Sequence, residues 1–426
     1  MTTSTTYIGD RRRQALERVS TLRRHPASHS VRRGPPPAMF YVIALVVGAF
    51  VMLGLVMVLS ASSISELQSG RSPWRLFNRQ LLWAALGTSG LVVAHRVALR
   101  RWRRLVGPFL CVGYALMCLP LVPGLGSRVN SATEWVVIGS FSFQPSEFLK
   151  LAIILYCAHL FAKRRMEMSN LRRTMLPPFG VACAGAGLCL LQGDFGSAMV
   201  LVAIVFVMAF IAGAPLPPMA AAGAAAAAAG FAFAMSSQRR ANRFTAFLDV
   251  VGNRDHLSYQ TWQAMIAIAQ GGATGQGPGR GTALLGGYLP LAQSDFIFAV
   301  IAQDFGLIGA VAVVGGFAVL TYAGVQVALA SNDHFAALVA GGIVGWFMVQ
   351  TAINVGGVTG LMPVTGLTLP FFSAGGSSLF ASMVAAGLLL NVARAIPGIA
   401  RAGAGSTGRR ARPSAPTPLP HRMSRS

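Results

Sequence analysis

The sequence predicts an all-α, polytopic membrane protein of about ten transmembrane helices, with one large external loop between spans seven and eight. Two observations lead to this prediction. Of 426 residues, 54% are hydrophobic and only 11% are charged, and the mean hydropathy is +0.58. Soluble domains carry about 25% charged residues. The apolar residues also fall in blocks of about 20, which is the length of a helix that crosses a bilayer.

The apolar blocks follow a polar segment rich in arginine. We expect residues 1–38 to form a disordered basic cytoplasmic tail, 39–393 the transmembrane domain, and 394–426 a second disordered basic tail. No cleavable signal peptide is visible, so the first block is expected to act as a signal anchor. The predicted spans are 39–61, 78–95, 105–123, 145–162, 176–192, 197–214, 217–235, 299–330 (broken near Gly306), 335–355 and 376–393.

The distribution of basic residues predicts the orientation. All but two of the 35 basic residues are arginines, and most lie in the tails and short loops. With both termini in the cytoplasm, 25 basic residues lie inside and 9 outside, in accord with the positive-inside rule. The net charge of +23 therefore indicates topology, and we expect no nucleic-acid partner. The stretch 236–306 is then outside the cell, with the loop itself at about 236–295.

Charged residues near the external ends of spans are candidates for chemistry. Glu147 and Lys150 are three residues apart on the fourth span and so share a helix face. Each charge needs a partner in lipid, so a structural ion pair and a direct substrate role both remain open. Asp194 lies in a short turn, where Asp and Gly occur for conformational reasons alone. Its depth near Glu147 also makes it a candidate ligand for a cation or substrate.

A third carboxylate, Asp295, lies where the large polar loop meets the eighth span. Ser294 could cap that helix and Asp295 could interact with its dipole in the first turn. A general base for a sugar hydroxyl would belong at the same boundary. Three arginines, Arg239, Arg240 and Arg243, begin the large loop. They would bind either a pyrophosphate at the headgroup level or the lipid headgroups.

Two segments rich in glycine complete the candidate regions. The run 271–281 lacks the Gly-Lys-Ser/Thr ending of a phosphate-binding loop, so we expect a flexible external loop. The segment from Asn354 to Ser378 is rich in Pro, Gly and Ser and separates the last two spans. It predicts a re-entrant hairpin, whose backbone must be buried in protein or line a cavity.

Several motifs occur in a fixed order along the chain. They are Ser60-Ala61-Ser62-Ser63, Val129-Asn130 with Trp135, Gln144 to Lys150, Gln192 with Asp194 and Gly196, Tyr259-Gln260, Leu289-Pro290, Asp295 to Val300, and Pro363 to Ser378. On these residues the chain resembles the shape, elongation, division and sporulation (SEDS) proteins of the FtsW and RodA type, across all ten spans.

The resemblance implies a peptidoglycan glycosyltransferase, an inverting hexosyltransferase that polymerises lipid II on the outer face of the bacterial cytoplasmic membrane. It places Asp295 at the family's essential external aspartate, as the catalytic residue. The residues that match substrate-binding positions are Glu147, Lys150, Asp194, Arg240, Arg243, Tyr259, Gln260, Trp135 and Ser377. No metal ligand is certain, although Asp295 and Asp194 could hold a divalent cation, Mg²⁺ or Mn²⁺.

The resemblance also implies partners: a single-span class B penicillin-binding protein that cross-links the new strand, and other divisome or elongasome membrane proteins. The sequence from Phe141 to Phe148 and the long basic tails favour the FtsW type, which acts in division at the septum. The chain departs from the family pattern at several positions. These are Glu134, Gly193, Leu291, Gln303 and Ala374.

Two other functions remain open. A lipid II flippase or ion-coupled transporter would use Glu147, Lys150 and Asp194 as coupling residues, although no inverted repeat is apparent. A non-catalytic division scaffold would tolerate substitution of Asp295.

Overall fold

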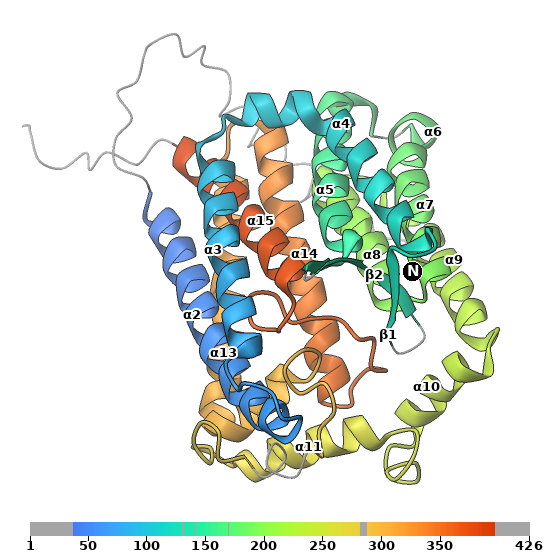
Figure 1. Cartoon of the computed structure of the whole chain (residues 1–426). Coiled ribbons are helices and arrows are strands. Elements are labelled where there is room, and N and C mark those ends of the chain that lie inside the picture. Colours follow the sequence, from blue (N-terminus) through green and yellow to red (C-terminus); the bar gives the residue numbers. More distant parts are fainter. Residues whose placement is uncertain (1–36, 130–131, 140, 169, 282–287, 397–426) are drawn as a thin grey trace, which may run out of the picture.

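A computed structural model describes residues 37–129, 132–139, 141–168, 170–281 and 288–396, so nearly all of both predicted tails lies outside the described residues. The described chain is a bundle of long helices, with two shorter helices across one end (Figure 1). The elements are α2 (Ala38–Gln68), α3 (Arg75–Arg96), α4 (Leu99–Cys118), η1 (Leu119–Leu121), β1 (Gly126–Val129), β2 (Ala132–Ile138), β3 (Phe141–Phe143), α5 (Pro145–Lys163), η2 (Arg165–Glu167), α6 (Leu171–Thr174), α7 (Leu176–Gln192), α8 (Phe195–Ala212), α9 (Leu216–Met235), α10 (Gln238–Leu248), α11 (Tyr259–Gly271), α13 (Ile297–Ala330), α14 (His334–Val358) and α15 (Gly376–Ala395).

Eight of the described helices are long and apolar enough to cross a membrane, namely α2, α4 extended by η1, α5, α8, α9, α13, α14 and α15. They confirm a helical, polytopic membrane protein with its longest connection between the seventh and eighth predicted spans. Each predicted span corresponds to one long helix. Two of these helices are not among the eight that are long and apolar enough to cross a membrane: α7 has only 17 residues, and α3 is more polar. The count of ten spans therefore stays a prediction.

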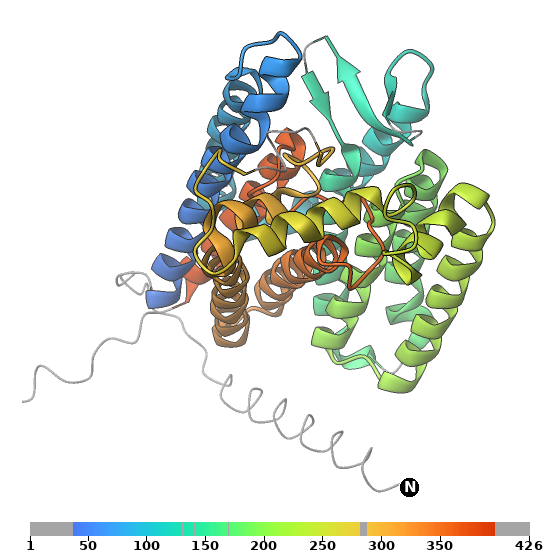
Figure 2. The same ribbon diagram turned by 90° about the horizontal axis from the view of Figure 1, so that it is seen from below.

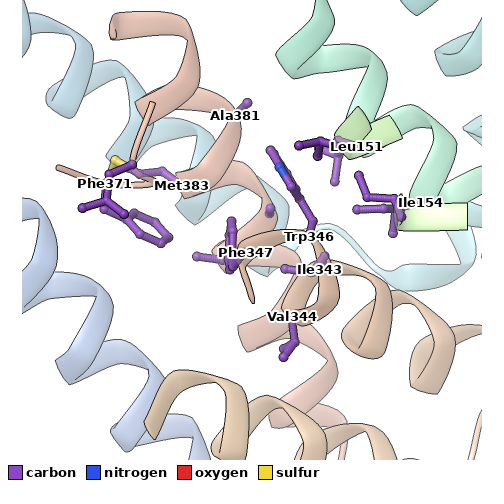
Figure 3. Close-up of a cluster of buried hydrophobic side chains, with 14 of the residues drawn as sticks. Leu151, Ile154, Ile343, Val344, Trp346, Phe347, Phe371, Ala381 and Met383 are labelled. Carbon is purple, nitrogen blue, oxygen red and sulfur yellow. The ribbon is translucent and has the colours of Figure 1, made fainter. Parts of the chain in front are cut away.

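Helix α14 lies at the centre of the bundle, packed against α5, α8, α13 and α15. Figure 3 shows Trp346 and Phe347 of this helix between Leu151 and Ile154 of α5 on one side and Phe371 on the other. The rings of Phe347 and Phe371 are 5.1 Å apart. Since close packing leaves little freedom to move, polar side chains presented by α14 are held firmly in place.

The long helix α13 is broken at Gly306, as the sequence predicted, with φ +68° and ψ −160°. The glycine run docks against this break. The N–H of Leu307 donates to the carbonyl of Gly272 at 2.9 Å, and a Cβ on Gly275 would lie 2.2 Å from the carbonyl oxygen of Asp304. The prediction of a flexible loop is therefore wrong for 271–281, because glycine is needed there for close backbone contact.

Strands β1, β2 and β3 form an antiparallel sheet in the order β1-β2-β3, which the sequence did not predict. Gly126 pairs with Val136 of β2, and Val136 pairs in turn with Phe143 of β3. Figure 2 shows the sheet at the same end of the molecule as α10 and α11. The sheet leads directly into α5.

The connection between α14 and α15, residues 359–375, has no helix or strand and is called the inner loop below. Every residue from Leu367 to Ser373 is buried. This non-helical backbone inside the bundle agrees with the predicted re-entrant segment, because such backbone needs protein partners at membrane depth.

Candidate active site

A cavity of about 660 Å³ opens at the end of the bundle that carries α10 and α11. Its walls come from α3, β2, the turn before α8, α10, α11, the turn before α13 and the inner loop. The polar and charged residues that line it include Arg79, Glu134, Trp135, Gln144, Asp194, Arg243, Gln260, Gln293, Asp295 and Thr368. Segments far apart in sequence therefore meet around one polar space.

Half of the predicted site residues line this cavity. They are Trp135, Asp194, Arg243, Gln260 and Asp295. The other half lie outside its lining. They are Glu147, Lys150, Arg240, Tyr259 and Ser377. Four positions at which the sequence was expected to depart from the family pattern also line the cavity. They are Glu134, Gly193, Leu291 and Ala374.

Asp295 lies in the turn that precedes α13. The expectation that it occupies the first turn of a helix capped by Ser294 is wrong, because α13 begins at Ile297 and the Ser294 hydroxyl donates to the carbonyl of Leu291 at 3.2 Å. Burial raises the pKa of Asp295 to about 6, against the opposing effects of Ser294 and Arg243. Such a carboxylate is ionised at neutral pH and is still basic enough to accept a proton.

A second pair of carboxyl groups lines the wall formed by β2 and the start of α8. Asp194 caps α8 by accepting the N–H of Ser197 at 2.8 Å, which confirms its conformational role. The Gln144 side-chain amide donates both to Asp194, at 3.1 Å, and to Glu134, at 3.3 Å. Burial and the neighbouring Asp194 raise the pKa of Glu134 well above its usual range. Glu134 therefore holds a proton more readily than an ordinary glutamate.

The arginines differ in where they point. Arg243 of α10 and Arg79 of α3 both line the cavity, and Arg79 donates to the Ser142 hydroxyl. Arg240 instead lies over the ring of Phe233, 4.0 Å from its centroid, and donates to the Phe233 carbonyl at 3.1 Å. Of the two matched arginines, Arg243 is the one available to a ligand in the cavity.

Glu147 and Lys150 form an ion pair inside the bundle, 1% and 0% exposed. The Lys150 ammonium donates to Glu147 at 2.9 Å and to the side-chain oxygen of Gln350 at 2.9 Å. The Trp346 indole donates to the same Gln350 oxygen at 2.7 Å. The structural ion pair is thus present, while a contact with substrate stays a prediction.

The remaining predicted residues adjoin the cavity wall. Ser377, at the start of α15, is buried and accepts the backbone N–H of Gln144 at 3.0 Å. Tyr259 is the first residue of α11 and precedes Gln260, which does line the cavity. Their substrate-binding roles stay predictions.

The fit of a divalent cation can be judged from the donor set. Within the described ranges, no group of three or more His, Cys, Asp or Glu side chains could hold a metal ion. Asp194 and Asp295 line the same cavity, but both Asp194 oxygens already accept hydrogen bonds from Ser197 and Gln144. These residues do not form a ready cation site, and a Mg²⁺ or Mn²⁺ ion stays a prediction.

Sequence reasoning missed two residues that the geometry brings to the site. Arg79 was counted only as an external charge, although it lines the cavity. Asn354 of α14 donates its amide to the backbone carbonyl of Asp295 at 2.9 Å. A polar residue inside an apolar span was the available signal for Asn354.

The chain is similar to known proteins over most of its length. The model of a family of FtsW, RodA and SpoVE proteins, described as "Cell cycle protein", matches residues 40–396. The probable peptidoglycan glycosyltransferase FtsW of Mycobacterium tuberculosis is 37% identical over 364 residues, covering 85% of this chain and 69% of the relative. Stage V sporulation protein E of Bacillus subtilis is 33% identical over 365 residues, covering 86% and 99%.

Solved structures agree with this similarity. A chain from work on the structural coordination of polymerization and crosslinking by a peptidoglycan synthase complex superposes with a TM-score of 0.68 at 29% identity, covering 85% of this chain and 98% of that chain. The rod shape determining protein RodA of Thermus thermophilus gives 0.60 at 28% identity, covering 86% and 98%.

Proposed function

Since the chain belongs to the FtsW, RodA and SpoVE family, we propose that it is a peptidoglycan glycosyltransferase that polymerises lipid II with Asp295 as its general base. The observation that supports this most directly is the Asp295 carboxyl group, which lines a polar cavity and has a pKa raised to about 6 by burial. The cavity volume of about 660 Å³ is within the range of small-molecule sites.

The reaction follows from that placement. Asp295 accepts the proton of the acceptor GlcNAc 4-hydroxyl, whose oxygen attacks the anomeric carbon of a lipid-linked MurNAc. A new β-glycosidic C–O bond forms as the C–O bond to the pyrophosphate breaks, and undecaprenyl pyrophosphate leaves with the electron pair. A positioned base contributes about 10²–10⁴-fold to such a step.

The leaving pyrophosphate requires positive charge. Arg243 and Arg79 lie on the α10 and α3 walls of the cavity, and guanidinium groups bind phosphate bidentately. Stabilising the charge that develops on the leaving oxygen is a large contribution to catalysis. We assign this role to Arg243 and Arg79, and a structural role to Arg240.

The setting of the reaction follows from the topology. With both termini in the cytoplasm, as the arginine distribution favours, the cavity opens on the outer face of the membrane. Similarity to proteins named FtsW favours a place at the division septum, with a class B penicillin-binding protein as partner. A similar chain is described as part of a peptidoglycan synthase complex, which fits such a partner.

The decisive experiment is polymerisation of labelled lipid II by the purified protein, alone and with its cognate transpeptidase. Long glycan strands are expected from the wild type, and Asp295→Asn should reduce them by at least about 100-fold, since the amide cannot accept the proton. Melting temperature and lipid II binding of the variant serve as controls and should remain close to wild type.

Two outcomes would contradict the proposal. Robust polymer from Asp295→Asn would remove Asp295 as the base. Lipid II binding without strands in any condition, together with transfer of labelled lipid II across vesicle membranes, would favour the flippase function instead. Binding with neither strands nor transfer would favour the scaffold.

A further inference from the structure

The turn that carries Asp295 is held by its backbone carbonyls. Three consecutive carbonyls, those of residues 293–295, each accept a hydrogen bond from the inner loop or α14. The donors are the N–H of Ala374 at 2.8 Å, the hydroxyl of Ser373 at 2.6 Å and the side-chain amide of Asn354 at 2.9 Å, in that order. The position of the Asp295 side chain therefore depends on three donors, and two of them, Ser373 and Asn354, lie outside the cavity lining.

Asn354 connects this turn to the inner loop. Its side-chain nitrogen donates both to the carbonyl of Asp295 and, at 2.6 Å, to the carbonyl of Leu367. The side chain is 5% exposed, and its oxygen has no hydrogen-bond partner among the described residues. The amide nitrogen thus makes two hydrogen bonds to backbone carbonyls at the junction of the two segments.

Gln350 lies one helical turn before Asn354 on α14. Its side-chain nitrogen donates at 2.9 Å to the carbonyl of Thr368, the residue that follows Leu367 in the inner loop. Its side-chain oxygen accepts from Lys150 and Trp346. Gln350 and Asn354 are four residues apart and so share a face of α14. The central helix α14 therefore holds two adjacent loop carbonyls and, through Asn354, the Asp295 turn.

Ser373 completes the arrangement from the loop side. Its hydroxyl donates to Ser294 and accepts the N–H of Leu369 at 2.8 Å, and its carbonyl accepts from Gln80 of α3 at 3.1 Å. The loop is thereby tied to a third helix. The Asp295 turn has no regular secondary structure of its own, so these bonds replace the support that a helix would give.

We propose that Asn354 is a positioning residue for glycosyl transfer, and that its two backbone bonds hold the Asp295 carboxylate in reach of the acceptor hydroxyl. This inference rests on the proposed function, because it assigns to Asn354 the alignment of the base and no direct contact with substrate. A misplacement of about 1 Å can lower an enzymatic rate by about 10²-fold.

The test compares Asn354→Ala with a matched control on the same helix. Thr351→Val is suitable, because Thr351 lies nearby on α14, is 7% exposed, and its hydroxyl has no partner among the described residues. Lipid II polymerisation is measured as a function of substrate concentration and pH. Asn354→Ala should lower kcat by roughly 10–100-fold with KM within about twofold, whereas Thr351→Val should stay within about twofold in both.

The pH profile separates positioning from a general loss of structure. A loosened turn admits water to Asp295, which lowers its pKa from about 6 towards the ordinary value, so the acidic limb of kcat/KM should move to lower pH. Fewer active molecules would lower the rate without moving that limb. Ser373→Ala removes the donor to Ser294 and the acceptor of the Leu369 N–H, with almost no change in volume. It should give the same shift, with a smaller loss of roughly 3–10-fold.

Unchanged kcat and an unmoved acidic limb in both Asn354→Ala and Ser373→Ala would overturn the inference. Should Asn354→Ala fail to fold, the Ser373→Ala profile decides on its own. The Asp295→Asn variant keeps the two proposals separate. Its inactivity alongside full activity of both other variants rejects only the positioning role, and full activity of Asp295→Asn rejects the base itself.

Discussion

The buried charges of this protein fall into two regions with opposite character. Beneath the cavity, Glu147 and Lys150 are paired at 2.9 Å, and Gln350 provides the ammonium with a further acceptor. In the cavity wall, Glu134 and Asp194 share one amide donor, and no described cation forms an ion pair with either of them or with Asp295. The first region pairs its two charges within the protein, although Glu147 Oε2 has no hydrogen-bond partner among the described residues. The second region leaves its carboxyl groups without a cationic partner.

This difference gives a physical criterion for separating structure from chemistry. A compensated pair has little to gain from a ligand, because its Coulomb energy is already realised within the protein. For Asp295 and Glu134, burial without a cationic partner raises the pKa of the carboxyl group. We therefore expect substitutions beneath the cavity to act on stability, and substitutions in the wall to act on rate and its pH dependence.

The largest effect is expected from breaking the buried pair. Lys150→Met leaves the Glu147 carboxylate without its partner, which should cost about 3–5 kcal/mol of unfolding free energy. Thermal unfolding in detergent would measure the loss. The control is the double variant Glu147→Gln with Lys150→Met, which removes both charges and should recover most of the stability. A Lys150→Met protein as stable as wild type but inactive would instead favour a direct role in catalysis.

The next prediction concerns the pH dependence of kcat/KM. Asp295 must be deprotonated to act as a base, and burial sets its pKa at about 6. Below that value kcat/KM should fall about tenfold per pH unit, since each unit protonates another tenfold share of the base. Polymerisation rates between about pH 5 and 8 would test this, with unfolding temperatures at each pH as control. A profile that stays flat below pH 6 would exclude Asp295 as the titrating base.

Arg243 and Arg240 lie on the same helix, α10, and we expect their substitution to have different effects. Arg243→Ala should raise KM for lipid II by about tenfold, because Arg243 lines the cavity and a guanidinium group can bind phosphate. Arg240→Ala should change KM by less than about twofold and lower the unfolding free energy by about 0.5–1 kcal/mol, through loss of its contact with Phe233. Equal kinetic defects in both variants would contradict this assignment.

The smallest effect is expected from Glu134→Gln. The raised pKa keeps Glu134 protonated at neutral pH, and glutamine resembles that neutral form, so the rate at pH 7 should change by less than about threefold. At alkaline pH the wild-type carboxyl ionises and adds negative charge beside Asp194. The variant should therefore lose less activity than wild type as pH rises. An identical alkaline limb in the two proteins would argue against any influence of Glu134 on the reaction.

Much of the fold could be predicted because lipid imposes simple rules on sequence. Apolar blocks of the correct length marked each long helix, and the break in α13 was marked by Gly306. Strands β1, β2 and β3 were missed because they are only three to seven residues long, too short for a repeating pattern of polar and apolar residues to mark them. The glycine run was misinterpreted because composition does not reveal which backbone a glycine approaches.

The site was predictable to the extent that its residues are charged. Asp295 and Asp194 stand out because acids are rare in this sequence, and both line the cavity. Arg240 and Arg243 could not be distinguished, because three residues along a helix decide which of them faces the cavity. Asn354 and Ser373 act through backbone carbonyls, and sequence alone does not show which carbonyl a side chain will reach.

The contact between the glycine run and the broken helix restricts which substitutions this sequence can accept during evolution. A Cβ at Gly275 would lie 2.2 Å from the carbonyl oxygen of Asp304, and one at Gly306 would lie 2.4 Å from the backbone nitrogen of Gly275. Both glycines also have φ in the left-handed region. Because each position meets backbone atoms, no compensating change of a neighbouring side chain can make room. A lineage that retains this broken helix is therefore expected to inherit the two glycines together.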